Sequence, residues 1–135
     1  MVSFKTLAGA ALAALPSASA YVNAVTGPET ATAGSDITAT VTTSIYVQNW
    51  VDYSIVWGIA PVTYNCANYN CVGQQIAYTA GYPDQFPIGN FTQDLTVPSS
   101  LAAGDYQVFA AVPYLVGASG TVSVESFHFN LTVTA

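Results

Sequence analysis

The sequence predicts an all-β protein, a single immunoglobulin-like or fibronectin-like antiparallel β-sandwich of about seven strands. Three observations support this fold class. Apolar and polar residues alternate along most of the chain after residue 20, β-branched and aromatic residues are frequent in these runs, and clusters of Gly, Pro, Ser and Asp separate them. Because no stripe of helical periodicity follows residue 20, a sandwich of short strands is the expected architecture.

The strands can be placed from the alternation and from the turn residues between the runs. The predicted strands are residues 21–26, 36–44, 52–60, 74–79, 91–97, 105–114 and 122–134. Trp57 lies in the middle of the third run, where such sandwiches often bury an aromatic anchor. Leu101 to Tyr106 resembles a tyrosine corner, in which the Tyr hydroxyl bonds to the backbone just upstream. An ordinary inward-facing aromatic is the alternative for Tyr106.

The N-terminal segment has the features of a secretory signal peptide, and we predict that residues 1–20 are removed. Lys5 gives a short positive region, residues 7–15 are apolar, and residues 18–20 fit the small-residue motif that precedes a cleavage site. The apolar run is too short to span a bilayer. Residues 21–135 would then form one secreted β-sandwich domain.

The charge pattern argues against several classes of protein. Lys5 is the 1 basic residue of the chain, whereas 7 acidic residues are present and all lie downstream of it. Without Lys or Arg, the mature chain cannot neutralise phosphates, so we expect neither nucleic-acid binding nor docking on anionic membranes. No second hydrophobic segment or lipid-anchor signal is visible. The prediction is a soluble, released monomer.

Cys66 and Cys71 are the 2 cysteines of the chain, and we predict that they form a local disulfide. A structural zinc site needs four ligands, and a redox pair usually has two intervening residues, so both alternatives fit poorly. The closed loop is short, and the chain-entropy account gives it only about 2 kcal/mol. Such a disulfide would stiffen a loop tip that carries Tyr69.

No catalytic arrangement is visible in the sequence. His128 is the 1 histidine and has polar neighbours along its strand, which indicates an outward-facing side chain. The G-x-S-x-G motif and phosphate-binding loops are absent, and the acids lie mostly at turns or strand ends. We therefore expect no enzymatic activity, no metal and no cofactor.

Two features concern the surface of the protein. Asn90 and Asn130 each begin an N-x-T sequon and are predicted glycosylation sites, although either sequon could remain unused. The segment between the last two predicted strands is apolar and Gly-rich, which favours a contact surface. The candidate partner-binding residues are Tyr114, Leu115, Val116, Gly117, Ala118, Ser119 and, on the cysteine loop, Tyr69. Alternatively, residues 114–116 extend the strand into the core.

Three segments together resemble a known family. They are Gly58-Ile59-Ala60-Pro61, the run VPSSLAAGDYQVFAAVPYLVGAS from Val97 to Ser119, and the closing Phe127 to Val133. In this order they resemble the necrosis-inducing secreted protein family of fungal effectors. The resemblance implies a protein that binds plant receptor-like kinases, suppresses pattern-triggered immunity and can induce host cell death. It also implies a host apoplastic location, with entry into host cells as a further option.

A different function remains open on the same fold. A glycan-binding or structural cell-wall module would use exposed aromatic rings to stack on sugars. The tyrosines that could serve this purpose are Tyr64, Tyr69, Tyr78 and Tyr82.

Overall fold

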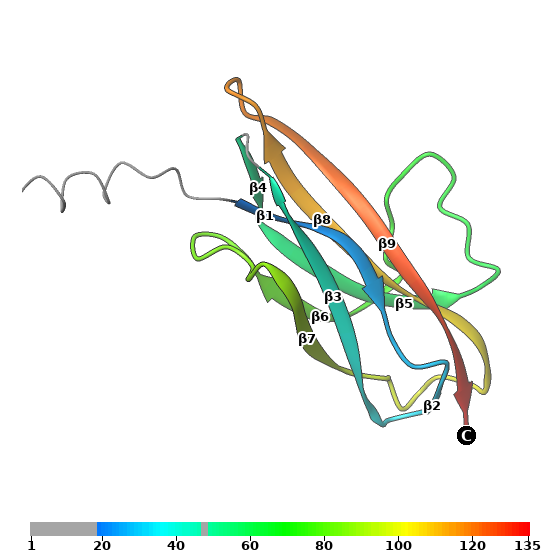
Figure 1. Cartoon of the computed structure of the whole chain (residues 1–135). Coiled ribbons are helices and arrows are strands. Elements are labelled where there is room, and N and C mark those ends of the chain that lie inside the picture. The colour runs from blue at the N-terminus through cyan, green and yellow to red at the C-terminus, as the bar shows by residue number, and fades with distance from the viewer. Residues whose placement is uncertain (1–18, 47–48) are drawn as a thin grey trace, which may run out of the picture.

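The computed structural model describes residues 19–46 and 49–135, which form two β-sheets packed against each other (Figure 1). Most of the predicted signal peptide lies outside the described residues, so its cleavage stays a prediction. The strands of the described part are β1 (Ser19–Thr26), β2 (Thr30–Thr32), β3 (Asp36–Tyr46), β4 (Trp50–Asp52), β5 (Ser54–Pro61), β6 (Gln74–Ala80), β7 (Gly89–Thr96), β8 (Gly104–Val116) and β9 (Thr121–Thr134).

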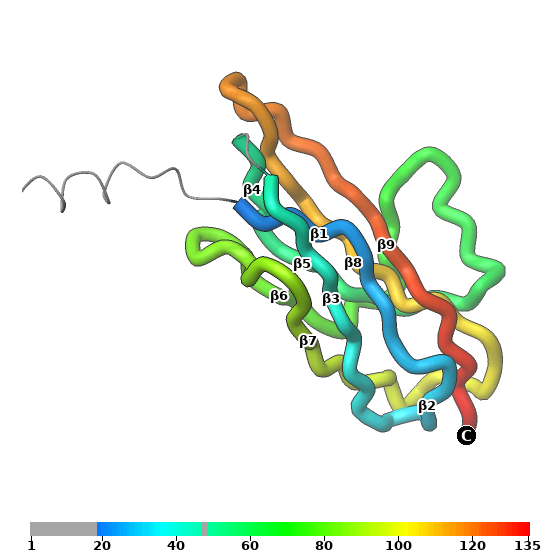
Figure 2. The backbone as a smooth tube through the Cα atoms, in the orientation of Figure 1, coloured from blue at the N-terminus to red at the C-terminus, as the bar shows by residue number. Residues whose placement is uncertain are grey.

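The two sheets differ in size. One sheet has the order β1-β3-β7, and the other has the order β2-β9-β8-β5-β6 with β4 paired to β8. The chain changes sheets between β1 and β2, and β2 then lies beside the C-terminal end of β9 (Figure 2). β2 and β9 run parallel, whereas the other strand pairs are antiparallel.

The prediction of an all-β sandwich is confirmed, but the count of about seven strands is too low for the described residues. β2 and β4 have 3 residues each, too few to show an alternating pattern. The predicted strand 52–60 is divided at Tyr53, and the predicted strand 105–114 continues to Val116. The antiparallel pattern also has one exception, because β2 enters from the other sheet and meets β9 in the same direction.

Trp57 is confirmed as the aromatic anchor of the core. It is the largest of the fully buried side chains, with 0% exposure. Its indole Nε1 donates a hydrogen bond to Thr79 Oγ1 at 2.8 Å, and Thr79 Oγ1 donates to Gln93 Oε1 at 2.7 Å. This chain of hydrogen bonds links β5 and β6 to β7 in the opposite sheet, so the buried indole satisfies its polar atom.

The tyrosine corner is also confirmed. The hydroxyl of Tyr106, near the start of β8, donates a hydrogen bond to the carbonyl oxygen of Ala102 at 2.8 Å. The ring of Tyr106 is buried with the core cluster. The corner therefore fixes the connection between β7 and β8, where the chain passes from the smaller sheet to the larger one.

Candidate protein-binding surface

The apolar segment predicted as a binding loop forms a β-hairpin instead. Residues 113–116 belong to β8, and only the tip at residues 117–120 is a turn between β8 and β9. Gly117 has φ +80°, a conformation that L side chains rarely adopt, which explains a glycine at that position. Gly117, Ala118 and Ser119 are exposed, as expected for contact residues, whereas residues 114–116 are half-buried.

Tyr114 anchors this hairpin to the rest of the protein. Its ring stacks on Trp50 with 4.2 Å between centroids and 4° between planes. Trp50 also contacts Tyr46 and Tyr21, at 5.0 and 5.6 Å between centroids. Residues 114–116 thus extend β8, as the alternative states, but they are half-buried and do not join the core cluster. The role of Tyr114 is to hold the hairpin by aromatic packing.

A pair of acids, Asp52 and Glu125, lies near this aromatic cluster, and no local sequence pattern indicates it. Asp52 is 4% exposed and accepts hydrogen bonds from Val22 N–H and Trp50 Nε1–H, both at 2.7 Å. Burial raises the pKa of the Asp52 carboxyl, although the bonds from Val22 and Trp50 oppose that shift. Burial and then the charge of Asp52 raise the pKa of Glu125. Because one oxygen of Asp52 accepts from the Val22 N–H of β1, the Asp52 carboxyl holds β4 to β1.

The predicted disulfide between Cys66 and Cys71 is confirmed, with 5.9 Å between the two Cα atoms. The loop that contains it, residues 62–73, folds back over the outer face of the larger sheet. Val72 packs so closely on Gly58 that a Cβ at Gly58 would overlap the Val72 carbonyl oxygen. Glycine at position 58 therefore lets the loop lie against β5.

This loop also reaches β9. The side-chain Nδ2 of Asn70 donates a hydrogen bond to the carbonyl oxygen of Val124 at 3.2 Å. Val124 pairs with Pro113 of β8, next to Tyr114, so the structure brings the two predicted contact regions together. Tyr69 at the loop tip is 80% exposed, in agreement with a contact role.

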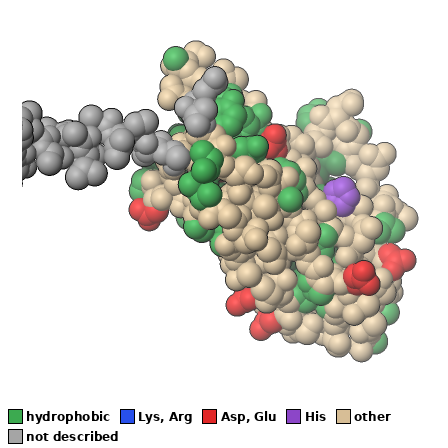
Figure 3. All heavy atoms as spheres, in the orientation of Figure 1, with side chains coloured by type: hydrophobic (Ala, Val, Ile, Leu, Met, Phe, Trp, Pro, Cys, Tyr) green, Lys and Arg blue, Asp and Glu red, His purple; other side chains and the backbone are tan. Residues whose placement is uncertain are grey.

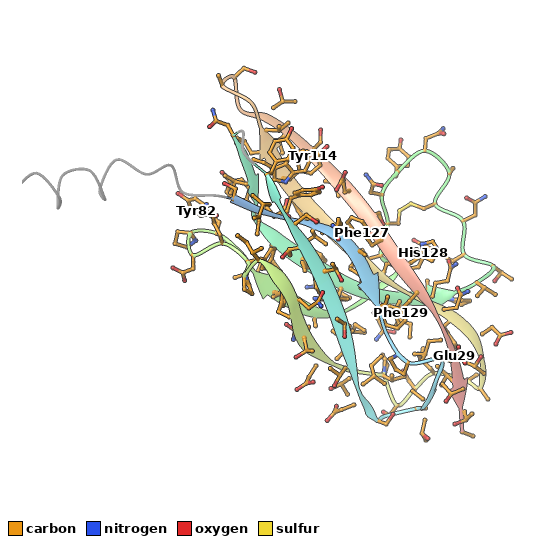
Figure 4. The ribbon with its side chains drawn as sticks, viewed as in Figure 1. Glu29, Tyr82, Tyr114, Phe127, His128 and Phe129 are labelled. Carbon is orange, nitrogen blue, oxygen red and sulfur yellow. A yellow bond between two sulfur atoms is a disulfide. The ribbon has the colours of Figure 1, made fainter. Side chains whose placement is uncertain are left out.

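The hairpin and the loop expose apolar side chains near each other. Val122 is 68% exposed and Val124 is 39% exposed, both on the same side of β9. Hydrophobic side chains gather over the end of the molecule that carries β4 and the hairpin (Figure 3). His128 is exposed on β9 beside the disulfide loop, and Tyr114 lies at the hairpin end (Figure 4).

Three of the other acids make structural hydrogen bonds between strands. Asp36, Asp94 and Asp105 each accept a hydrogen bond from a threonine hydroxyl on a neighbouring strand. Three shallow hollows of about 460, 440 and 360 Å³ each contain at most one carboxylate and no histidine. Within the described residues, no group of three or more His, Cys, Asp or Glu could hold a metal ion, and no helix is long and apolar enough to cross a membrane.

Other predicted surface residues are placed as follows. Asn90 on β7 and Asn130 on β9 are both exposed, so each sequon is accessible, and glycosylation stays a prediction. The remaining tyrosines considered for sugar stacking, Tyr64, Tyr78 and Tyr82, are exposed too. Among the described residues, only Tyr82 of these lies against another aromatic ring, that of Tyr53 at 5.0 Å.

The fold resembles a solved structure, the CARDB domain from Pyrococcus furiosus determined by solution NMR. The TM-score is 0.50 with 14% identity, over 87% of this chain and 95% of that domain. At this identity the likeness concerns the fold alone, and it confirms the predicted immunoglobulin-like β-sandwich. The structure thus defines a small sandwich whose hairpin and disulfide loop expose apolar side chains.

Sequence comparison places this sandwich among secreted fungal effectors. Residues 18–134 match the Nis1 family. Necrosis-inducing secreted protein 1 of Colletotrichum higginsianum is 32% identical over 98% of this chain and 90% of its own length. The protein of the same name from Colletotrichum orbiculare is 31% identical over 98% of this chain and 81% of its own length. The chain belongs to the Nis1 family and is a secreted protein, which confirms the predicted resemblance.

Proposed function

We propose that this protein acts by binding host proteins, without catalysis, and that it suppresses pattern-triggered immunity through receptor-associated plant kinases and induces plant cell death. Membership of the Nis1 family carries the proposal, because two relatives are named as necrosis-inducing secreted proteins. Kinase binding comes from the resemblance in the sequence. The exposed apolar hairpin and loop supply a surface suited to protein contact.

The proposal is tested with secreted protein that begins at its own processed N-terminus. Infiltrated into leaves, it should cause cell death, and it should weaken the oxidative burst that a flagellin peptide induces. Immobilised protein should retain the cytoplasmic domain of a receptor-associated kinase. Chemically unfolded protein is the control for all three measurements. Normal leaves, an unchanged burst and no retention would together contradict the proposal.

A glycan-binding module is the second candidate, favoured by the exposure of Tyr64, Tyr69, Tyr78 and Tyr82. Aromatic rings on a surface can stack on sugars, and Tyr82 packs against a second ring, that of Tyr53. Pelleting with insoluble chitin or β-glucan separates the two candidates. Retention that is lost in Tyr69→Ala and Tyr78→Ala would favour the glycan module, whereas protein that stays in the supernatant would exclude it.

A further inference from the structure

We propose that residues Thr121–Asn130, the open half of β9, bind an extended segment of a partner protein by strand addition. This inference rests on the proposed function and deepens it by naming the surface and the chemistry of the partner. The remaining residues, Leu131–Thr134, are the covered half of β9, because β2 pairs with the strand there.

Among the described strands, none pairs with one edge of the open half of β9. β8 pairs with β9 from Thr121 to Val133 without a register shift. On the other edge, β2 pairs only with Thr132, Val133 and Thr134. The disulfide loop reaches this edge through the hydrogen bond from Asn70 to the Val124 carbonyl oxygen. An unpaired strand edge is a template for another strand.

Three observations identify which main-chain groups face this edge. Thr132 N–H donates to Glu29 O at 2.8 Å, on the β2 side. The Val124 carbonyl accepts from Asn70, outside the β8 ladder. Opposite Val124, Pro113 has no N–H, and its carbonyl accepts from Tyr53 N–H at 2.9 Å on the β5 side. In β9, the even-numbered residues therefore present their N–H and C=O groups to the open edge, and the odd-numbered residues bond to β8.

These groups form a regular row. The residues that present them are Val122, Val124, Ser126, His128 and Asn130. They span roughly 27 Å at the usual rise of a strand. An extended peptide would continue, on this edge, the ladder that β2 begins at Thr132. The open edge also lacks proline and lysine, the residues that usually protect such edges from pairing.

The side chains around the edge define the chemistry of the partner. On the outer side, Val122 and Val124 are exposed and Tyr69 lies at the tip of the adjacent loop. On the inner side, Glu125 lies near Asp52, and its raised pKa reflects burial next to another acid. The chain has no basic residue after Lys5 to neutralise either acid. A segment that alternates apolar and basic residues would match both sides.

A proline substitution tests the edge with little disturbance to the fold. Ser126→Pro removes an N–H that faces the open edge. The hydrogen bonds between β9 and β8 are kept, because they are made by the odd-numbered residues of β9. Ser99→Pro is the matched control. Ser99 is exposed in the turn closed by Leu101 N–H and Pro98 O, at a position where proline is favoured. Thermal unfolding should confirm that both variants fold.

The readout is cell death in leaves as a function of dose. Ser126→Pro should require at least about tenfold more protein than wild type, because the ring removes a hydrogen bond and obstructs the incoming strand. Ser99→Pro should match wild type. A folded Ser126→Pro with wild-type potency would overturn this inference and leave the proposed function intact. An inactive wild type would overturn both.

A second measurement uses the unmodified protein and stays decisive if Ser126→Pro fails to fold. Amide exchange is followed by NMR with and without the cytoplasmic domain of a receptor-associated kinase. Binding should slow exchange at Ser126 and His128, whose amides face the edge. Binding without slower exchange at these amides would overturn strand addition but support the proposed function. No binding would overturn the kinase mechanism and this inference together.

Discussion

The two halves of β9 differ although they belong to one continuous strand. In the covered half, Leu131 and Val133 are each 1% exposed and β2 pairs with the outer edge. In the open half, Val122 and Val124 are exposed, and no strand of the described part of the chain pairs with the outer edge. The covered half belongs to the scaffold, because its side chains complete the core. The open half packs Phe127 and Phe129 against the core on its inner side, but its even-numbered side chains are exposed and its outer main-chain groups stay available for contact.

The largest effect should come from the scaffold. Trp57→Ala removes the largest buried side chain and should lower the free energy of unfolding by about 3–5 kcal/mol. Val122→Ala in the open half should change it by less than about 0.5 kcal/mol. Chemical denaturation measures both values. Equal losses of stability in the two variants would break the contrast between scaffold and open half.

A smaller effect should follow loss of the disulfide. Replacing both cysteines with serine should destabilise the protein by about 2 kcal/mol, because the unfolded chain is no longer constrained. The loop should also loosen and leave the Val124 carbonyl more exposed. Tyr69→Ala, on the same loop, is the control and should keep wild-type stability. A double variant as stable as wild type would show that the loop is held by Val72 and Asn70 alone.

The tyrosine corner should contribute less. Tyr106→Phe keeps the ring and removes only the bond to Ala102 O, at a cost of about 1 kcal/mol. Tyr78→Phe changes an exposed ring in the same way and should have no effect on the unfolding midpoint. If Tyr106→Phe unfolds at the wild-type midpoint, the hydroxyl does not stabilise the connection between β7 and β8.

The acid pair predicts a direction of pH dependence. The pKa of Asp52 is raised in the folded protein, so folding is favoured by its protonation. The contribution of Asp52 to stability should therefore increase as pH falls from neutrality through its raised folded pKa, towards the unfolded value near 3.8. Asp52→Asn should reduce this increase. Unfolding is measured on N-terminally acetylated protein, so that no α-ammonium group contributes. Identical pH profiles would contradict the role given to Asp52.

Part of this picture could be predicted from the sequence because it depends on local patterns. Alternation located the main strands, Trp57 stood at the centre of an apolar run, and the segment before Tyr106 had the spacing of a tyrosine corner. The cysteine pair in a secreted chain indicated the disulfide. Each of these features depends on neighbouring residues, so one sequence was sufficient.

The rest depends on contacts between distant segments. The strands β2 and β4 are too short to give a periodic signal, and the pairing of β2 with β9 follows from a change of sheet. The return of the disulfide loop depends on the absence of a side chain at Gly58, which leaves room for Val72. The proximity of Asp52 and Glu125 arises only when β4 and β9 both lie against β8.

The contrast between the two halves of β9 is tested most directly by amide exchange in the free protein. The Thr132 amide is bonded to Glu29 O at 2.8 Å and should exchange slowly. The Ser126 and His128 amides face the open edge and should exchange at nearly the rate of an unstructured chain. Slow exchange at Ser126 and His128, comparable to that of Thr132, would show that the edge is already covered and would contradict the account.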